Sequence, residues 1–378
     1  MRCLSFIAII VLSLHPSFAG EELERFVIRE LKSSRTIEGR LVFEGVDGGI
    51  WVEDRAGRLI SVPGDEIESR EVTSEAFVHF TADELALKLK QEAGPDFEIL
   101  QTDHYVICSS ANSVYTEFCG KLLELVFQEF FEEFAKSRGL SIREPSYKLP
   151  IVIFATPKDF GAYASRQHPE VDFSDTPGYY TVRDNQVLLL DLSGDRSMKT
   201  VAAIRRKLAE KPLQIATVVH ETVHQLCFNS GLQVRMADNP LWLSEGIALW
   251  FEQGSSRASL LWSRPGQVSV RHHPVFVQMS RAAALEPTLQ SLLNNDRLLQ
   301  EAATAPAAYA ESWALVTWLM KQHREGFDKY LKVISERKPF VRVSAEERTA
   351  EFEAAIGKSP DEIEKTLIPF ISRLRPAR

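Results

Sequence analysis

The chain has 378 residues, of which 44% are hydrophobic and 25% charged, and its formal net charge is -8. This balance indicates a globular protein with enough apolar residues for one large domain or two smaller ones. Because the charge is negative and the chain has no basic run, we expect no nucleic-acid partner and no attachment to an anionic membrane surface.

The first residues are typical of an export signal. Arg2 supplies a positive charge, residues 6–14 are apolar apart from Ser13, and the sequence SFA at 17–19 matches a small-x-small cleavage site. We therefore predict a signal peptide over residues 1–19 and a mature protein that is secreted or periplasmic. The apolar run is too short for a membrane span, and no later segment reaches the ~20 apolar residues that a span requires.

Cysteine usage does not indicate a disulfide scaffold. Removal of the signal peptide takes away Cys3 and leaves Cys108, Cys119 and Cys227, an odd number for an exported protein. At least one thiol must then be unpaired. Two arrangements are open. Cys108 and Cys119 form a disulfide, or all three thiols are free and buried. No cluster of Cys and His suggests a structural zinc site.

Residues 24–72 are predicted to form a small all-β module. Short apolar stretches alternate with turn sequences such as DGG at 47–49 and DRAG at 54–57. This pattern suggests four or five strands in an SH3-like barrel, with a binding or spacing role. The charged, helix-prone residues 73–96 are interpreted as a helical connector.

Residues 97–376 are predicted to form an α+β domain with a mixed sheet and a helical C-terminal part. Its first half alternates strands with helices, and everything from about residue 199 onward is predicted to be helix or loop. The expected strands are 97–108 around a turn at 102–103, 149–154, 178–181 and 186–192, and the expected helices are 113–137 and 157–165.

The most informative segment is the sequence HETVH at residues 220–224, inside a predicted helix. Pro212 suits the first turn of this helix, apolar residues recur at spacings of three to four, and NSG at 229–231 ends it. Four residues advance a helix by slightly more than one turn, so His220 and His224 project from nearly the same side and can close on one zinc ion. Glu221 is displaced around the helix and can reach a water on the metal instead.

A third zinc ligand is available on the next predicted helix, which has Asn239 as its N-cap and Pro240 at its first position, and which stops at Gly254. Glu245 is the only acidic residue in the middle of this mostly apolar segment. An isolated buried carboxylate costs several kcal/mol and therefore needs a partner. Zinc is that partner in our interpretation, and an ion pair with an arginine such as Arg235 is the alternative.

These residues resemble the gluzincin metallopeptidases, in which a helical HExxH is followed by a glutamate on a second helix. The sequence WLSEGIALWFE at 242–252 is similar to the WLxEGxA stretch of aminopeptidase-N-type enzymes. Across residues 97–372 the order of elements also resembles secreted bacterial members of this superfamily.

The resemblance implies a zincin-like fold and a secreted zinc peptidase that acts on peptide or protein substrates. It implies that His220, His224 and Glu245 bind zinc and that Glu221 is the general base. It also implies a tyrosine that stabilises the oxyanion, for which Tyr309 lies at a comparable distance downstream. Packing beside Trp313 is the other interpretation of Tyr309. In addition, two tyrosines of the predicted hairpin compete for the catalytic role, Tyr179 and Tyr180.

The chain departs from the resembled enzymes in three respects. The GxMEN-type segment that binds a free substrate N-terminus in aminopeptidases is absent, so an endopeptidase is favoured. Position 249 is Leu, where thermolysin-like enzymes have an Asp that orients a zinc-bound histidine. The spacing from His224 to Glu245 is slightly longer than in aminopeptidase-N-type enzymes, and the oligomeric state is not predicted.

The sequence leaves two other functions open. In one, the zinc site is structural or vestigial and the protein binds a cell-surface component without catalysis. In the other, zinc-dependent hydrolysis acts on a bond other than a peptide. Among the remaining histidines, His272 and His273 precede Pro274 and are expected on a loop, as a solvated pair or in contact with substrate. Four more are expected to be surface or packing residues, namely His79, His104, His168 and His323.

Overall fold

The computed structural model describes residues 22–30, 33–169, 173, 176–191, 193, 197–281 and 288–376. The predicted signal peptide, residues 1–19, lies outside the described residues. The chain divides into two compact units, residues 1–79 and 80–378. None of the described helices is both long and apolar enough to cross a bilayer.

The first unit is all-β in its described residues, as predicted, and neighbouring strands of its sheet are antiparallel. A small core lies on one side of the sheet and includes Phe26 and Val52, both fully buried. The strands follow the order β4-β3-β2-β1-β5 across the sheet. Their bounds are β1 (Glu22–Arg29), β2 (Ser34–Glu44), β3 (Ile50–Asp54), β4 (Leu59–Val62) and β5 (Ile67–Ala76), with a 3-10 turn η1 (Gly64–Glu66) before β5.

The segment predicted as a connector, residues 73–96, contains the end of β5 and helix α1 (Ala82–Ala93). Thr81 and Glu84 form a reciprocal capping box at the start of α1, which satisfies backbone N–H groups of its first turn. Helix α1 packs against strands of the second unit and is part of that unit.

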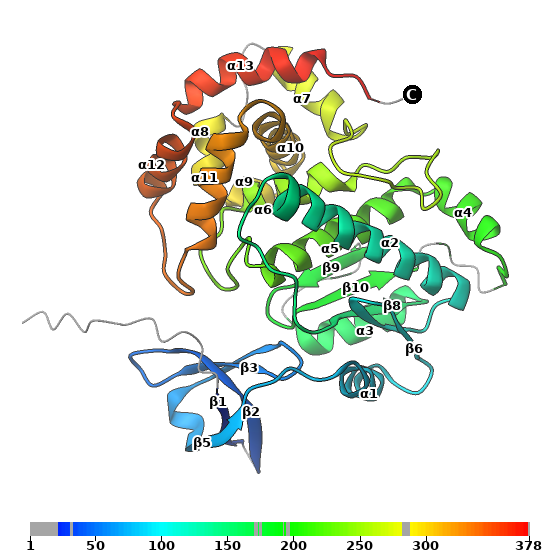
Figure 1. Cartoon of the computed structure of the whole chain (residues 1–378), viewed down its shortest axis with the longest axis vertical. Helices are drawn as coiled ribbons and strands as arrows, with labels where there is room; N and C mark the ends of the chain where they lie inside the picture. The colour runs from blue at the N-terminus through cyan, green and yellow to red at the C-terminus, as the bar shows by residue number, and fades with distance from the viewer. Residues whose placement is uncertain are drawn as a thin grey trace, which may run out of the picture. The chain divides into compact units, whose positions relative to one another are not determined.

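The second unit contains a mixed sheet in the order β6-β7-β8-β10-β9 (Figure 1). The two outer pairs of strands are antiparallel and the inner pairs are parallel. Strand β9 therefore forms one edge of the sheet and pairs with β10, as the predicted hairpin requires. The strand bounds are β6 (Glu98–Gln101), β7 (Tyr105–Ser109), β8 (Leu149–Phe154), β9 (Gly178–Thr181) and β10 (Gln186–Leu190).

The inner strands β7, β8 and β10 are buried along their whole length, which explains their continuous apolar sequences. Alternate residues such as Ile151 belong to the large core shared with α2 (Ser113–Phe131) and α5 (Pro212–Asn229). On the opposite face, Phe154 contacts Phe160 and Tyr163 of α3 (Pro157–Gln167), at ring-centroid distances of 5.6 and 5.2 Å. Helix α2 continues into a π-helical segment, η2 (Glu132–Ser137), where one regular helix was predicted.

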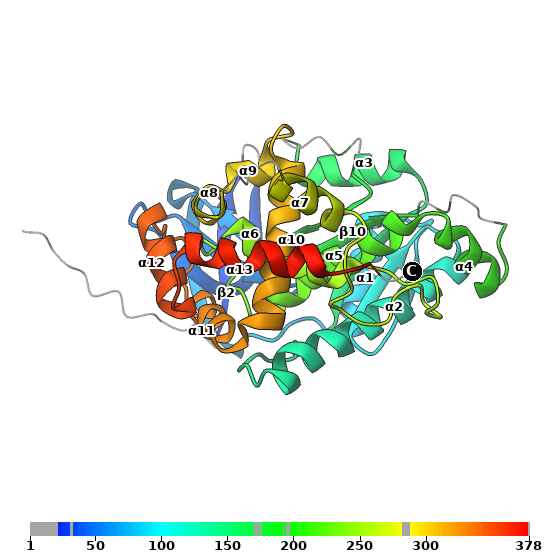
Figure 2. The ribbon, with the colours of Figure 1, turned by 90° about the horizontal axis from the view of Figure 1, so that it is seen from above.

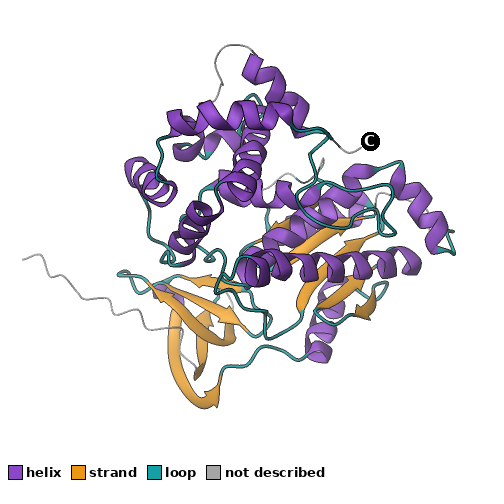
Figure 3. Cartoon of the chain, turned by 45° about the horizontal axis from the view of Figure 1, so that its top comes forward, coloured by secondary structure: helices purple, strands orange, loops and turns teal. Residues whose placement is uncertain are grey.

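From residue 197 onward the described chain is helix and irregular structure, as predicted (Figure 3). Helix α10 lies at the centre of this helical part and packs against α6, and α13 crosses α10 in the view from above (Figure 2). The bounds are α4 (Val201–Ala209), α6 (Leu241–Glu252), α7 (His272–Arg281), α8 (Leu289–Asn294), α9 (Arg297–Gln300), α10 (Ala305–Gln322), α11 (Arg324–Ser335), α12 (Ala345–Ile356) and α13 (Pro360–Arg373).

Gly246 allows α6 and α10 to approach closely. A Cβ at this position would lie 2.5 Å from Cγ2 of Val316 and 2.8 Å from the carbonyl oxygen of Ser312. We expect Gly246→Ala to lower the free energy of unfolding by about 1–3 kcal/mol, because the two helices must move apart. Denaturant unfolding followed by circular dichroism measures this change.

A matched control is available in α3, where Gly161 is also inside a helix. A Cβ at Gly161 would meet no atom within 4 Å. Gly161→Ala should therefore raise the free energy of unfolding by roughly 0.5–1 kcal/mol through helix propensity alone. Equal stability of Gly246→Ala and Gly161→Ala would contradict the close approach of α6 and α10 at Gly246.

Candidate functional site

Helix α5 carries the two histidines of the HETVH sequence. It begins at Pro212, as predicted, and its apolar face, including Val219 and Val223, is fully buried in the core. His220 and His224 lie one turn apart with their rings edge to face, at a centroid distance of 4.7 Å. Their Nε2 atoms are 3.0 Å from each other.

Helix α6 carries Glu245 and starts one residue later than predicted. Pro240 has an extended backbone, so Leu241 is the first helical residue. The prediction that Asn239 caps this helix is wrong, because its side-chain amide donates to the backbone carbonyls of residues 234 and 237. The carboxylate of Asp296 instead accepts from the Leu241 N–H at 2.9 Å, so a distant segment fixes the first turn of α6.

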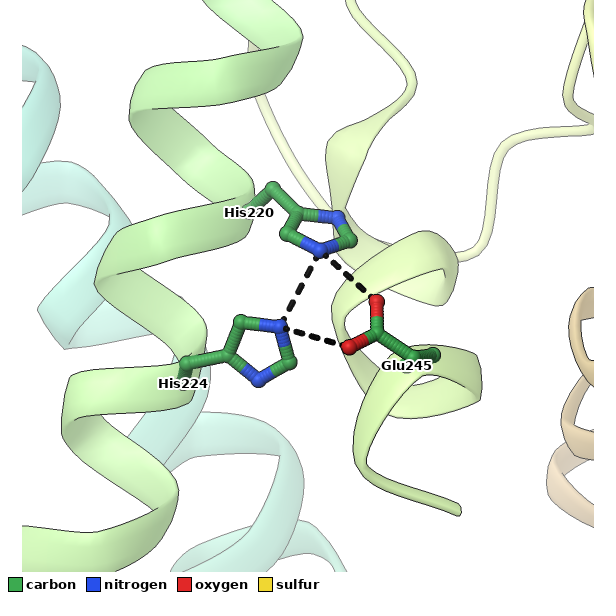
Figure 4. Close-up of side chains that lie close together, drawn as sticks. All are labelled: His220, His224 and Glu245. Carbon is green, nitrogen blue, oxygen red and sulfur yellow. Dashed lines mark hydrogen bonds and ion pairs between the residues drawn. The ribbon is translucent and has the colours of Figure 1, made fainter. Parts of the chain in front are cut away.

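His220, His224 and Glu245 form a group that could hold a metal ion, and all three ligand atoms lie within 4.8 Å of one another. The carboxylate is 3.1 Å from Nε2 of His220 and 3.6 Å from Nε2 of His224. Figure 4 shows the two rings and the carboxylate turned toward one point between α5 and α6. Arg235, the alternative partner of Glu245, instead donates to the carbonyl oxygen of Val182 at 2.8 and 3.0 Å.

Burial and the two histidines act in opposite directions on Glu245. Burial alone raises the pKa of this carboxyl, but the adjacent imidazoles of His224 and His220 lower it well below its usual range. For His220, burial lowers the pKa, and the carboxylates of Glu245 and Glu252 outweigh this effect and raise it well above 6.5. The group is therefore held together by charge in a buried setting.

Glu252 lies behind His220 and was missed by the sequence analysis. One of its oxygens is 3.3 Å from Nδ1 of His220, and the other is 3.3 Å from Nε2 of His272, at ion-pair distance. Burial raises the pKa of Glu252, but the His220 and His272 imidazoles outweigh burial and lower it to about 2. Glu252 thus orients His220. In thermolysin-like enzymes an Asp at the position of Leu249 orients a histidine, and Leu249 cannot do so.

The prediction that His272 and His273 lie on a loop as a solvated pair is wrong. Both are buried, with 4% and 9% exposure, and they begin helix α7. Pro274 does not break the helix, because residues of the first turn need no backbone N–H partner within the helix. Nε2 of His273 lies 3.1 Å from the carbonyl oxygen of Ile371 and ties α7 to α13.

Glu221 lies on the side of α5 that faces strand β9. Its Oε2 accepts a hydrogen bond from the backbone N–H of Tyr180 at 2.8 Å. Burial raises the pKa of Glu221 above 4.5 and Glu245 adds to the rise, whereas His220 and the Tyr180 N–H oppose it. The Glu221 carboxylate is thereby fixed beside the metal-binding group but outside it.

The hairpin that carries β9 is fastened to α5. Asn185, at its turn, has a positive φ of 55° and donates from its side chain to Asn229 at 2.9 Å. Gln225, the residue after His224, donates to the Asn185 carbonyl oxygen at 3.0 Å. Gly178 lets the strand approach the helix, because a Cβ there would lie 2.8 Å from Cγ2 of Thr217. These contacts set the position of the edge strand relative to the site.

A cavity of about 230 Å³ opens beside the group, and both predicted catalytic residues, Glu221 and Tyr309, line it. Burial and the Glu245 carboxylate raise the pKa of Tyr309 above 10, and the charge of Arg271 opposes the rise. The tyrosine is therefore protonated near neutral pH and can donate a hydrogen bond into the cavity.

The two rival tyrosines place their side chains elsewhere. The Tyr179 ring stacks on Phe173 at 4.6 Å, on the face of the sheet covered by α3. The Tyr180 hydroxyl donates to the side chain of Asn185 at 2.9 Å, and the Tyr180 backbone N–H donates to Glu221. Of the three candidates, Tyr309 alone is among the residues that line the cavity.

The cysteines among the described residues are Cys108, Cys119 and Cys227, and all three are free and buried. Burial raises the pKa of the Cys108 and Cys119 thiols to about 12. The sequence left open a Cys108–Cys119 disulfide or three free thiols. The structure has three free thiols, which are part of the core.

Comparison with known proteins places the site inside one matched region. Residues 214–341 match the family described as "Protein of unknown function (DUF1570)". This span includes His220, Glu221, His224, Glu245 and Tyr309. A search of curated proteins gave no match.

Proposed function

We propose that the chain is an exported zinc-dependent peptidase of the gluzincin type, with a zincin-like fold in its second unit. The observation that carries the proposal is the convergence of His220, His224 and Glu245 beside a cavity lined by Glu221 and Tyr309. The composition of residues 1–19 supports export. The absence of a GxMEN-type segment favours cleavage within a chain over removal of its first residue.

Zinc fits the spacing of the donor atoms. Zn–N and Zn–O bonds are about 2.0–2.2 Å long, so ligands at the corners of a tetrahedron lie about 3.4 Å apart. The two Nε2 atoms are 3.0 Å apart, Oε2 of Glu245 lies 3.1 Å from Nε2 of His220, and Oε1 of Glu245 lies 3.6 Å from Nε2 of His224. Nδ1 of His220 lies against Glu252, which can accept its proton, so Nε2 is the atom that would bind zinc when the metal takes the place of a proton there. Two ring nitrogens and a carboxylate this close together in a buried site need a proton or a metal cation between them.

The number of ligands supports catalysis over a structural role. Within the described residues, the metal-binding group has three members. A structural zinc site has four protein ligands, whereas a catalytic site has three and keeps one position open. This argues against the alternative of a binding protein with a structural zinc.

Each catalytic side chain then has a defined task. Zinc, when bound, supplies Lewis-acid chemistry that lowers the pKa of water toward 7 and polarises the substrate carbonyl. Glu221 accepts a proton from the attacking water as the water oxygen bonds to the peptide carbonyl carbon, and returns it to the nitrogen as the C–N bond breaks. The Tyr309 hydroxyl donates to the carbonyl oxygen as negative charge develops on it.

Strand β9 offers a place for an extended substrate. It is the edge of the sheet, and Gly178 lines the cavity with Glu221. An extended peptide can add to such an edge through main-chain hydrogen bonds. In this arrangement the scissile bond lies over Glu221 and between β9 and Tyr309.

The proposal is tested by zinc content and peptide cleavage measured together. The protein without its signal peptide should contain one zinc per chain and cleave members of a mixed peptide library detected by mass spectrometry. A chelator should stop cleavage, and added zinc should restore it. Bound zinc without cleavage of any peptide would favour a non-catalytic protein or a hydrolase of other bonds.

Removal of the carboxylate behind His220 tests the orienting role of Glu252. Glu252→Ala should weaken zinc binding about 10–100-fold, because outer partners of ligating histidines have effects of this size. Competition with a chromophoric chelator measures the affinity. Glu210→Ala, at an exposed position after α4, is the control and should bind zinc as the wild type does. Unchanged affinity in Glu252→Ala would contradict the role.

A further inference from the structure

A larger cavity of about 380 Å³ adjoins the one beside the metal-binding group. The two share lining residues, namely Leu213, Ala216, Glu252 and Arg271. A third cavity, of about 250 Å³, meets the central one at Arg271, His272 and Tyr309. A substrate held over Glu221 therefore has room on both sides, and Arg271 stands where all three cavities meet.

The larger cavity is apolar in most of its wall but carries two arginines, Arg257 and Arg271. Its acidic lining residue, Glu252, lies 3.3 Å from Nδ1 of His220 and 3.3 Å from Nε2 of His272. Within the part of the chain that the structure describes, neither arginine has a carboxylate within ion-pair distance. The two guanidinium groups that line this cavity thus lack an ion-pair partner among the described residues.

The segments that carry the two arginines are anchored. The Oγ of Ser269 accepts from the Arg271 N–H at 3.3 Å, and the side chain of Gln253 accepts from the Val270 N–H at 2.9 Å. Arg205 of α4 donates to the carbonyl oxygens on both sides of Arg257, at 2.8 and 3.3 Å. The backbone at both positions is therefore held in place before any ligand enters.

We propose that this cavity binds a carboxylate of the substrate next to the scissile bond, with Arg271 as its main partner and Arg257 as a second. The inference rests on the proposed peptidase function. A planar guanidinium pairs with a carboxylate through two parallel hydrogen bonds, which gives both strength and orientation. The apolar wall, which includes Leu213, Leu261 and Val268, suits the aliphatic stem of such a residue. The carboxylate comes from an Asp or Glu side chain or from the C-terminus of the substrate.

Peptide pairs test the inference and identify the source of the carboxylate. One pair differs by Glu or Gln beside the scissile bond, and the other by a free or an amidated C-terminus. We expect the wild type to prefer one carboxylate member by about tenfold or more in kcat/KM. Arg271→Gln should lose this preference while it cleaves the neutral members at nearly the wild-type rate. Arg271→Glu should favour a peptide with Lys at the same place.

Arg281→Gln is the matched control, because Arg281 is exposed at the other end of α7 and lines none of these cavities. It should keep the wild-type preference. Equal loss of cleavage for all peptides in Arg271→Gln, or no preference in the wild type, would overturn the proposal.

A binding measurement separates this inference from the proposed function. Fluorescence anisotropy with labelled members of both peptide pairs, on zinc-loaded Glu221→Gln, does not depend on cleavage. If Glu221→Gln binds a carboxylate peptide more tightly than its neutral partner, and the double variant with Arg271→Gln does not, carboxylate binding in the cavity is supported. This holds even if the protein hydrolyses no peptide. Equal binding of acid and neutral peptides refutes the cavity even if the protein is a peptidase.

Discussion

Replacing Glu221 by glutamine is expected to lower kcat for peptide hydrolysis about a thousandfold while the protein keeps its zinc. Glutamine has nearly the same shape as glutamate, so the Tyr180 N–H can still donate to its side-chain oxygen. The amide, however, cannot accept a proton from water. Steady-state cleavage of a peptide found in the library measures the loss, and zinc content is determined on the same sample.

Glu210→Gln is the control for the Glu221 variant, since Glu210 is an exposed glutamate at the end of α4. It should retain wild-type cleavage and thermal stability. Full activity of Glu221→Gln would exclude Glu221 as the general base. Loss of zinc from Glu221→Gln would show that this carboxylate belongs to the metal-binding group, contrary to its position outside it.

Glu245→Ala should have the largest effect on zinc. It removes one of the three ligand residues and leaves His220 and His224, whose Nε2 atoms are only 3.0 Å apart, without a negative partner. We expect the zinc affinity to fall by more than the ~10–100-fold that outer partners contribute. Cleavage should be lost at zinc concentrations that saturate the wild type. Chelator competition on Glu245→Ala and Glu252→Ala gives the comparison directly.

The relative loss of zinc affinity in Glu245→Ala and Glu252→Ala distinguishes a zinc ligand from a residue that orients a ligand. Far-UV circular dichroism should show that both variants keep their helices, because α6 is held by packing on α10 and by Asp296 at its first residue. An affinity of Glu245→Ala equal to or higher than that of Glu252→Ala would mean that Glu245 is not a zinc ligand.

The local pattern of the sequence predicted that His220, His224 and Glu245 lie close together. The spacing of His220 and His224 on one helix follows from helical geometry, and the single acid in an apolar helix drew attention to Glu245. Both arguments use neighbours within one or two helices. The same is true of the hairpin 178–190, whose two strands and turn were predicted from short-range signals.

Contacts between distant segments could not be predicted in the same way. Glu252 and His272 meet only because an irregular stretch, residues 253–271, returns the chain to the site. One signal was present, since Glu252 lies two helical turns after Glu245 and so on nearly the same side of α6. Pro274 misled the prediction for His272, because a proline after two polar residues fits a loop as well as a first helical turn.

The cap of α6 shows the same limit. Asn239 before Pro240 is a typical start of a helix, but the side chain of Asn239 turns back to its own loop. The acceptor for Leu241 comes from Asp296, more than fifty residues later, and Arg348 pairs with that carboxylate at 2.8 Å. Only the packing of the helical part brings these groups together.

Anomalous diffraction at the zinc edge, from crystals of the zinc-loaded protein, tests the central claim most directly. We predict one strong peak between α5 and α6, about 2.0–2.2 Å from Nε2 of His220, Nε2 of His224 and a carboxylate oxygen of Glu245, with no fourth protein ligand. A peak at another place, or a carboxylate of Glu245 turned away from the metal, would contradict the proposed peptidase site.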